Sequence, residues 1–151
     1  MELGSVLAFL GLGIMVGLSG FGSALMSGNI GCGVIGALKK RPDSFGSGLV
    51  MAAIPSTQAL YGFVGYVIFS GQLEQAGYST LNGAITLGAG LALGLVGLIS
   101  AISQGGVCIS GMNAIGNGHN VFGNTLILIA FPEFFAIMAL VTAILLSQLI
   151  K

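Results

Sequence analysis

The sequence predicts an all-α membrane protein with four transmembrane helices, arranged as two tandem helical hairpins in a parallel repeat and assembled into a homo-oligomeric ring. Three observations predict this class: the 151-residue chain is 55% hydrophobic, its few charges separate long apolar stretches, and its two halves resemble each other. Only 5% of the residues are charged, against about 25% in soluble domains. Eight charges cannot cover a water-facing surface, which excludes a soluble enzyme. The absence of a basic patch in the sequence excludes a nucleic-acid partner.

Four apolar segments are separated by short polar breaks. The first break is a charged cluster at residues 39–43, the second is a polar stretch at 70–80 that contains Glu74, and the third is residues 116–120, which contain His119. The segments between them cover residues 3–38, 45–69, 81–115 and 121–150. Each is longer than the roughly 20 residues that a helix needs to cross a bilayer. None shows the alternating polarity of a membrane β-strand, so each predicts a continuous transmembrane helix.

The chain contains an internal repeat with a constant offset between matching positions. Without any gap, small residues of the first segment match those of the third, and Pro55 matches Pro132. Because two helices separate equivalent points, both copies cross the membrane in the same direction. The repeat predicts a first hairpin over residues 1–75 and a second over 76–151.

Glycine is abundant, with 27 residues, and is concentrated in the first and third segments. Two GxxxG pairs, Gly13/Gly17 and Gly90/Gly94, are of the kind that lets helix backbones approach closely. Six further glycines extend this character in the first segment: Gly4, Gly11, Gly22, Gly31, Gly33 and Gly36. We expect the two narrow helices on the inside of a tight ring and the bulkier second and fourth helices outside. Ordinary packing within one four-helix bundle is the alternative.

Basic residues predict the orientation of a multi-pass protein in the cell membrane. Lys39, Lys40 and Arg41 place the first loop in the cytoplasm, because cytoplasmic loops carry an excess of Lys and Arg. The loop at 116–120 then faces the cytoplasm too. Both termini and the loop containing Glu74 face the opposite side.

Glu133 is the only charged residue within the four segments. An ionisable side chain at the centre of a bilayer costs about 2.5–3.5 kcal/mol on insertion scales, and such residues commonly mark ion or proton pathways. The matching residue in the first repeat is Ser56, so the chain has one carboxyl group per four helices. The structural alternative is a neutral glutamic acid hydrogen-bonded to a neighbouring helix.

Other polar side chains lie at the same predicted depth as Glu133. Glu133 and Gln104 flank the third break, and Thr57 and Gln58 follow the first. At about 1.5 Å per residue, each lies roughly 20 Å along its helix from that break. We expect these four side chains, from three helices, to converge. Tyr61 lies one turn further along the same face as Thr57 and Gln58, where its hydroxyl can donate to the carboxylate.

Oxygen ligands without sulfur or imidazole suit hard cations. A proline lacks the N–H that the helix needs, and distortion at Pro55 is expected to free the Ile54 carbonyl as a further ligand. One carboxylate balances one monovalent cation, whereas a proton would leave several neutral oxygens superfluous. This set of oxygen ligands favours Na⁺ over H⁺.

These residues resemble the proteolipid rotor-ring subunit of V-type (V/A-type) ATPases across essentially the whole chain. IPSTQALYGF at residues 54–63 and SQG at 103–105 are similar to the Na⁺-pumping bacterial members. In FPEFF the chain departs from the family's pattern, because Pro132 precedes the acid. The resemblance implies that the Ile54 carbonyl, Thr57, Gln58, Gln104 and Glu133 ligate Na⁺ and that Tyr61 is hydrogen-bonded to Glu133.

The resemblance also implies a rotary mechanism with no covalent chemistry in this chain. Identical copies form a ring among membrane lipids, and an essential arginine of a stator subunit displaces the ion at Glu133. ATP hydrolysis elsewhere turns a central stalk that docks on loops 39–44 and 116–120. Two alternatives stay open: the same ring with H⁺ as the coupling ion, and a non-rotary oligomeric membrane pore or structural protein.

Overall fold

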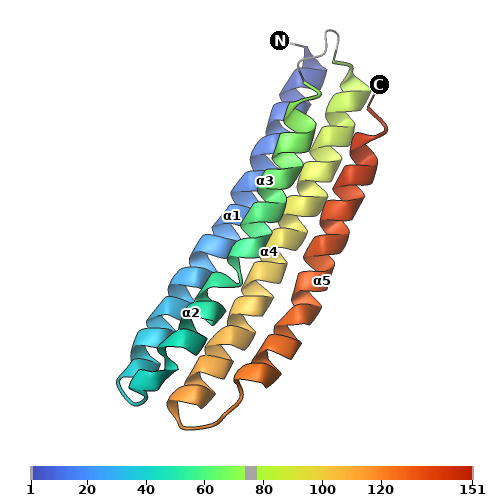
Figure 1. The fold of residues 1–151 in the computed structure, drawn as a ribbon. Coiled ribbons are helices and arrows are strands. Elements are labelled where there is room, and N and C mark those ends of the chain that lie inside the picture. The colour runs from blue at the N-terminus through green and yellow to red at the C-terminus, as the bar shows by residue number, and fades with distance from the viewer. Residues whose placement is uncertain (1, 74–77, 151) are drawn as a thin grey trace.

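A computed structural model describes residues 2–73 and 78–150 as a bundle of long helices (Figure 1). In chain order, the elements are α1 (Leu3–Leu38), the 3₁₀ turn η1 (Pro42–Ser44), α2 (Phe45–Ala53), α3 (Ser56–Ser70), α4 (Thr80–Gly116) and α5 (Phe122–Ser147). Four spans are long and apolar enough to cross a membrane, with η1, α2 and α3 together forming the second. The predicted all-α membrane class is confirmed, and the described residues contain no strand.

The two ends of the bundle differ in what they carry. The start of α1 and the end of α5 lie at one end, and the loops at 39–44 and 116–120 lie at the other (Figure 1). Lys40 Nζ donates to Asn117 Oδ1 at 2.9 Å, which joins these two loops. The prediction for the loop containing Glu74 lies outside the described residues.

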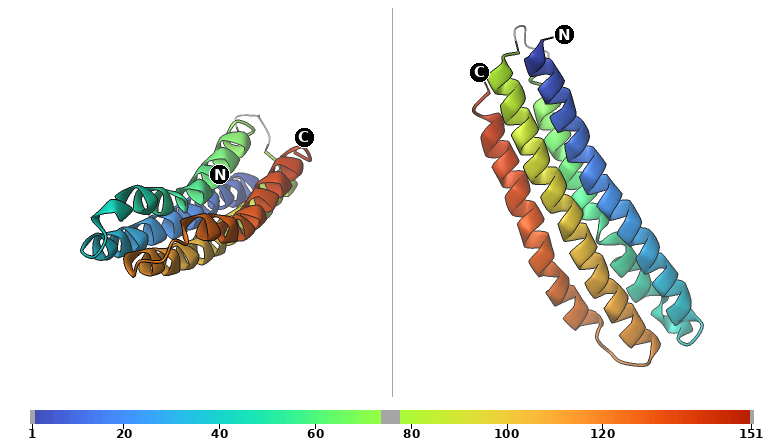
Figure 2. Two further views of the ribbon diagram at one scale, coloured as in Figure 1. Left: turned by 60° about the horizontal axis from the view of Figure 1, so that its bottom comes forward. Right: turned by 180° about the vertical axis from the view of Figure 1, so that it is seen from behind.

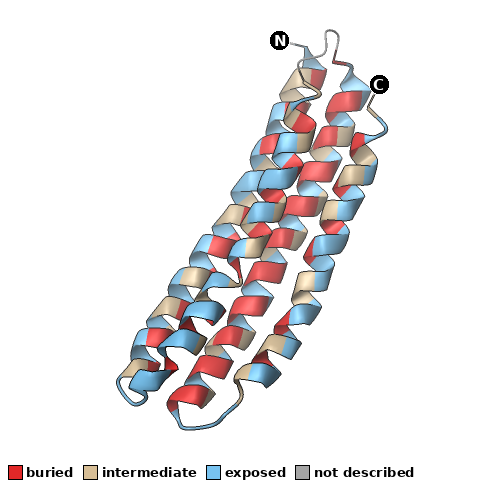
Figure 3. Cartoon of the chain, in the orientation of Figure 1, coloured by how far each residue is buried: buried red, intermediate tan, exposed pale blue. Residues whose placement is uncertain are grey.

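The bundle has two layers. The glycine-rich helices α1 and α4 lie side by side, and α3 and α5 lie against the same face of that pair (Figure 2). α4 also contacts both α3 and α5, and buried residues run along its length (Figure 3). The helices that carry few bulky side chains are therefore paired with each other, as expected from the glycine content.

Glycines allow α1 and α4 to touch backbone to backbone. A Cβ added at Gly11 would collide with the Thr86 carbonyl, and one added at Gly90 would collide with the Gly11 carbonyl. Gly94 meets the α1 backbone in the same way, so the Gly90/Gly94 pair packs as predicted. Small residues at such a contact let two helices approach more closely than side chains allow.

The Gly13/Gly17 pair does not pack within the chain. A Cβ at either position would meet nothing within 4 Å. Packing within one four-helix bundle, the alternative for these glycines, therefore does not account for this pair, and close packing inside a ring stays a prediction. Gly4 and Gly11, two helical turns apart, set the face of α1 that meets α4. Gly13 and Gly17 consequently lie on a different face of α1.

Two apolar clusters fill the interior, one toward each end. The first is centred on Ile30, Met51 and Met112 on the loop side, and the second on Met15 and Leu93 on the side of the termini. Between the clusters lies a layer of buried polar side chains that includes Ser23, Gln58, Ser100 and Gln104. The packing thus places a polar layer at mid-span between two apolar clusters.

The second span departs from the continuous helix predicted over 45–69. α2 ends at Ala53 and α3 begins at Ser56, whereas α5 continues through Pro132. Both the Thr57 N–H (3.1 Å) and the Thr57 Oγ1 (3.0 Å) bond to the Ile54 carbonyl, which tightens the turn at Pro55. The residue that matches Thr57 in the second repeat is Phe134, whose side chain has no donor. The first repeat therefore has a hydroxyl that strengthens this turn, and the second repeat does not.

We predict that Gly90→Ala destabilises the chain while Gly88→Ala, on the same helix, does not. The methyl group at position 90 would force α4 away from α1, an overpacking cost of about 1–3 kcal/mol. This cost exceeds the roughly 1 kcal/mol by which alanine is preferred to glycine in a helix. A Cβ at Gly88 meets nothing within 4 Å. Thermal unfolding of the purified chain in detergent measures both variants, and equal melting temperatures for the two would contradict the proposed contact.

Candidate functional site

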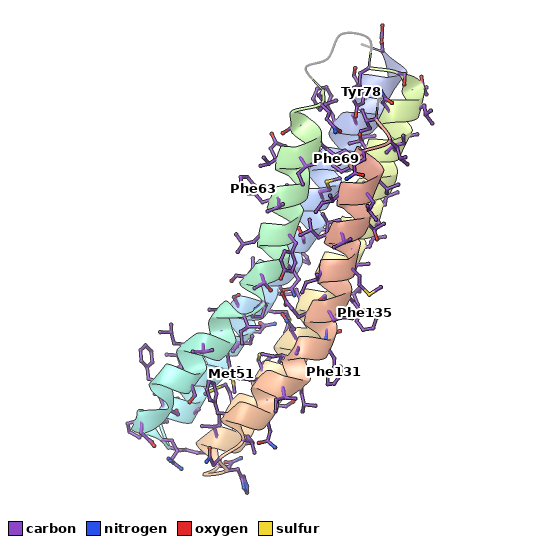
Figure 4. All side chains as sticks on the ribbon, turned by 45° about the vertical axis from the view of Figure 1, so that its right-hand side comes forward. Met51, Phe63, Phe69, Tyr78, Phe131 and Phe135 are labelled. Atoms are coloured by element: carbon purple, nitrogen blue, oxygen red, sulfur yellow. The ribbon has the colours of Figure 1, made fainter. Side chains whose placement is uncertain are left out.

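Glu133 lies near the middle of α5, where it is half-buried. Its neighbours Phe131, Phe134 and Phe135 are all exposed, and Phe131 and Phe135 project away from the bundle (Figure 4). The acid therefore lies at mid-span on a helix whose outer surface is apolar. Its carboxylate points to the interior, where α3 and α4 supply polar partners.

Four donors converge on the Glu133 carboxylate. Oε2 accepts hydrogen bonds from Thr57 Oγ1 at 2.9 Å, Gln58 Nε2 at 2.8 Å and Gln104 Nε2 at 2.6 Å, and Oε1 accepts one from the Tyr61 hydroxyl. The structure therefore brings together all five side chains that the sequence predicted to meet. Hydrogen bonds to a charged carboxylate are stronger than those between neutral groups.

Thr57 is surrounded by more oxygens than its single proton can serve. Its Oγ1 lies 3.0 Å from the Ile54 carbonyl, 3.2 Å from Gln58 Oε1 and 2.9 Å from Glu133 Oε2. A threonine hydroxyl has one proton to donate, so two of these three oxygen pairs have no proton from Thr57 between them. Four oxygens, that of Thr57 included, therefore gather at one point with a single hydroxyl proton among these three contacts.

Gln104 adds a buried acceptor to this region. Its Nε2 donates to Glu133 and, at 3.2 Å, to the Ile129 carbonyl, which uses both amide protons. Its Oε1 is buried and has no hydrogen-bond partner. An unpartnered buried acceptor costs about 1–3 kcal/mol, and a cation beside it would remove that cost.

Two serines that the sequence did not single out support the site. Ser100 Oγ donates to the Pro132 carbonyl at 2.7 Å and accepts from Gln58 Nε2 at 3.2 Å. Ser23 Oγ donates to the Pro55 carbonyl at 2.6 Å and accepts from the Ala59 N–H at 3.0 Å. Both serines match in the internal repeat, as do the prolines whose carbonyls they contact. The repeat was the signal that could have identified them.

The available ligands restrict which ions the site suits. Over the described parts of the chain, no group of three His, Cys, Asp or Glu residues lies close enough to hold a metal ion. The atoms that gather around Glu133 are carboxylate, amide, hydroxyl and carbonyl oxygens, which hard cations prefer. A single carboxylate balances one positive charge.

Comparison with known families supports the internal repeat. Residues 10–69 and 87–146 each match the family model that describes the C subunit of ATP synthase. The two matches have equal length, and the offset between them is the same as that between Pro55 and Pro132. The family model therefore divides the chain into the same two copies as the sequence pattern does.

Curated relatives cover nearly the whole chain. It is 36% identical over 141 residues to the K subunit of the A-type ATP synthase of Methanocaldococcus jannaschii, an alignment that covers 93% of this chain and 61% of that protein. It is 33% identical over 144 residues to the K subunit of the V-type sodium ATPase of Enterococcus hirae, covering 95% of this chain and 91% of that protein. The 16 kDa proteolipid of the V-type proton ATPase of Ovis aries is 26% identical over 146 residues, covering 97% and 94%.

We predict that Tyr61→Phe destabilises the chain more than Tyr66→Phe. The first change removes a donor to the carboxylate, and a hydrogen bond to a charged group contributes about 1.5–3 kcal/mol. Tyr66 lies on the same helix and is 39% exposed, with its ring stacked on Phe63. Thermal unfolding of the two variants in the same detergent gives the comparison. A melting temperature for Tyr61→Phe equal to that of Tyr66→Phe would show that the Tyr61 hydroxyl contributes nothing to the site.

Proposed function

The chain belongs to the family of the ATP synthase C subunit as a proteolipid rotor subunit of the V/A type, and we propose that each copy carries one Na⁺ through the membrane, coupled to ATP hydrolysis by other subunits. The ion ligands in this proposal are the Ile54 carbonyl, Thr57, Gln58, Gln104 and Glu133, with Tyr61 as a supporting hydrogen-bond donor. Na⁺ is the cargo, and this chain contributes binding, release and movement.

The observation that carries the proposal is the oxygen cluster around Thr57. Three oxygens lie within 3.2 Å of Thr57 Oγ1 there, and its hydroxyl has a single proton for the three contacts. The buried Gln104 Oε1 is a fifth oxygen without a hydrogen-bond partner. A small cation stabilises such a cluster, because oxygen atoms of mixed type are the ligands that hard cations prefer.

The arrangement of donors favours Na⁺ over H⁺. The amide N–H groups of Gln58 and Gln104 both donate to Oε2, and the Tyr61 hydroxyl donates to Oε1. A protonated carboxyl group has a proton of its own to donate, and a proton on Oε2 would have Thr57 Oγ1 as its one acceptor among these partners. An ionised Glu133 beside a bound cation keeps the two amides and the Tyr61 hydroxyl paired. Relatives named for sodium and for proton transport both occur, so the H⁺ ring stays the second candidate.

We propose that copies of the chain assemble into a ring surrounded by lipid. Support comes from the face of α1 that carries Gly13 and Gly17, where a Cβ would meet nothing within the chain. Further glycines of α1 also have open space around them, namely Gly20, Gly28, Gly31, Gly33 and Gly36. A helix surface with so few side chains suits close approach by another helix in a membrane.

In this proposal, the loops at 39–44 and 116–120 face the cytoplasm and the termini face the opposite side. Both loops lie at the same end of the bundle (Figure 1), and Lys39, Lys40 and Arg41 make that end basic. The Lys40–Asn117 hydrogen bond holds the loops together as a single surface. A central-stalk subunit would dock there.

Release of the ion requires a competing charge. While Glu133 faces lipid, a bare carboxylate is costly, so the site retains its cation. At a stator subunit, an essential arginine would replace Na⁺ as the partner of the carboxylate. Rotation would then carry each site from one access path to the next.

We predict that Na⁺ protects Glu133 from modification by a hydrophobic carbodiimide. Such reagents attack the protonated carboxyl group, and bound Na⁺ keeps Glu133 ionised and enclosed. Labelling is measured by mass spectrometry of membranes containing the chain, at several pH values, with NaCl or with choline chloride at equal ionic strength. Labelling that is independent of Na⁺ at every pH would reject the sodium proposal in favour of the H⁺ ring.

The double variant Gln58→Leu/Gln104→Leu is expected to lose this protection, because two ligand oxygens are removed. Gln148→Leu, which changes an exposed glutamine beyond the end of α5, is the matched control. The ligand set is wrong if the double variant requires no more Na⁺ for protection than the control does.

We predict that Glu133→Gln abolishes ATP-driven Na⁺ uptake by vesicles that contain the assembled complex. The amide is neutral and cannot balance a monovalent cation. Glu2→Gln, which changes an exposed residue before α1, should leave uptake unchanged. A non-rotary pore or structural protein would retain its function in Glu133→Gln, and that result would exclude the rotor proposal.

A further inference from the structure

Ser100 joins three helices at the edge of the ion site. It lies in α4, one turn before Gln104, and is 5% exposed. Its hydroxyl stands between the Gln58 amide of α3 and the Pro132 carbonyl of α5, at 3.2 and 2.7 Å. Neither of these two hydrogen bonds of Ser100 goes to Glu133.

The direction of each hydrogen bond follows from the chemistry of the groups. The Pro132 carbonyl can only accept, so the single Ser100 proton goes to it. A lone pair of Ser100 Oγ is then left to accept from Gln58 Nε2. Ser100 is therefore bound as a donor on one side and as an acceptor on the other, and the two roles cannot be exchanged.

The acceptor role of Ser100 favours one orientation of the Gln58 side-chain amide. One Nε2 proton goes to Ser100 and the other to Glu133 Oε2 at 2.8 Å, and the side chain is fully buried. Rotating the amide by half a turn would place Oε1 against the carboxylate and against the lone pair of Ser100, with no donor for either contact. Gln58 Oε1 consequently stays on the side of Thr57, within the oxygen cluster.

We propose that Ser100 is a positioning residue that holds the Gln58 oxygen toward the bound ion and thereby strengthens Na⁺ binding relative to H⁺ binding. The inference rests on the proposed Na⁺ site. Na⁺ needs the Gln58 oxygen as a ligand, whereas protonation of Glu133 does not. Without the hydroxyl, one Gln58 N–H loses its acceptor, and the bond to Glu133 alone is left to orient the amide.

The matching serine of the first repeat separates the two roles of the hydroxyl. Ser23 also donates to a proline carbonyl, that of Pro55, but it accepts from the backbone N–H of Ala59. The bond to the proline carbonyl is thus common to both repeats and is structural. Only Ser100 accepts from the side chain of a proposed ligand, and this second bond is the one on which the inference depends.

Ser100→Ala and Ser100→Thr test the proposal with a matched pair. Threonine keeps the hydroxyl, and its methyl group can enter the groove of about 500 Å³ that Ser100 lines between α4 and α5 with residues such as Ile99 and Phe135. Ser110→Ala, an exposed serine of the same helix that donates to the Gly106 carbonyl at 2.9 Å, is the control for loss of a hydroxyl.

The measurement is the NaCl concentration that halves carbodiimide labelling of Glu133 in membranes containing the full chain. Labelling without Na⁺ is recorded alongside it. Changing a residue that orients a ligand typically lowers metal affinity by about 10- to 100-fold, so Ser100→Ala should raise the half-protecting concentration at least tenfold. Its labelling without Na⁺ should match that of the wild type. Ser100→Thr and Ser110→Ala should stay close to the wild type throughout.

The outcomes separate a failure of the proposed Na⁺ function from a failure of the positioning role of Ser100. If Na⁺ does not protect the wild type, the proposed Na⁺ function fails. If Na⁺ protects the wild type and Ser100→Ala equally, the positioning role is overturned while the function stands. Equal weakening in Ser100→Ala and Ser100→Thr would also overturn it, because the shape of the side chain and not its hydroxyl would then be responsible. A loss of labelling without Na⁺ in Ser100→Ala would overturn it too, because the substitution would then have changed Glu133 itself and not only the binding of Na⁺.

Discussion

The carboxylate of Glu133 is the group on which the rest of the structure depends. An ionised side chain at this depth costs several kcal/mol, and α5 itself offers it only apolar neighbours. The compensation comes from α3 and α4, whose side chains donate four hydrogen bonds to its two oxygens. The helices α3, α4 and α5 must therefore keep a fixed axial register, and the packing of the rest of the bundle maintains it.

Packing keeps the helices in register. A slip of one residue along a helix is about 1.5 Å, which would take Gln104 Nε2 out of its 2.6 Å contact with the carboxylate. Slippage of α4 along α1 is opposed by close glycine–backbone contacts such as Gly90 on Gly11 and Gly94 on Ile14. The apolar clusters on either side of the polar layer then bring α3 and α5 against this pair.

The sequence predicted the number of spans, their ends to within a few residues and the residues that meet Glu133. Depth counted from the loops was sufficient for these because helices rise uniformly. Rotation about a helix axis was harder to predict: nothing in the sequence distinguished Gly11, which packs against α4, from Gly13 and Gly17, which lie on an open face of α1. Counting along a segment does not say which of several glycines faces a neighbour. Distortion at Pro55 was predicted, but the Ile54 carbonyl was expected to be freed and instead accepts from the N–H and the hydroxyl of Thr57, because the chain closes a tight turn there.

The hydroxyl of Ser23 has a mechanical consequence. It bridges the Pro55 carbonyl and the Ala59 N–H, so the first turn of α3 is pinned to α1 just where Thr57 and Gln58 leave the backbone. Any sideways displacement of α1 would pull on this turn and alter the spacing of the oxygens beside Glu133. Ser23 would thus couple a displacement of α1 directly to the turn of α3 that carries two of the residues at the carboxylate.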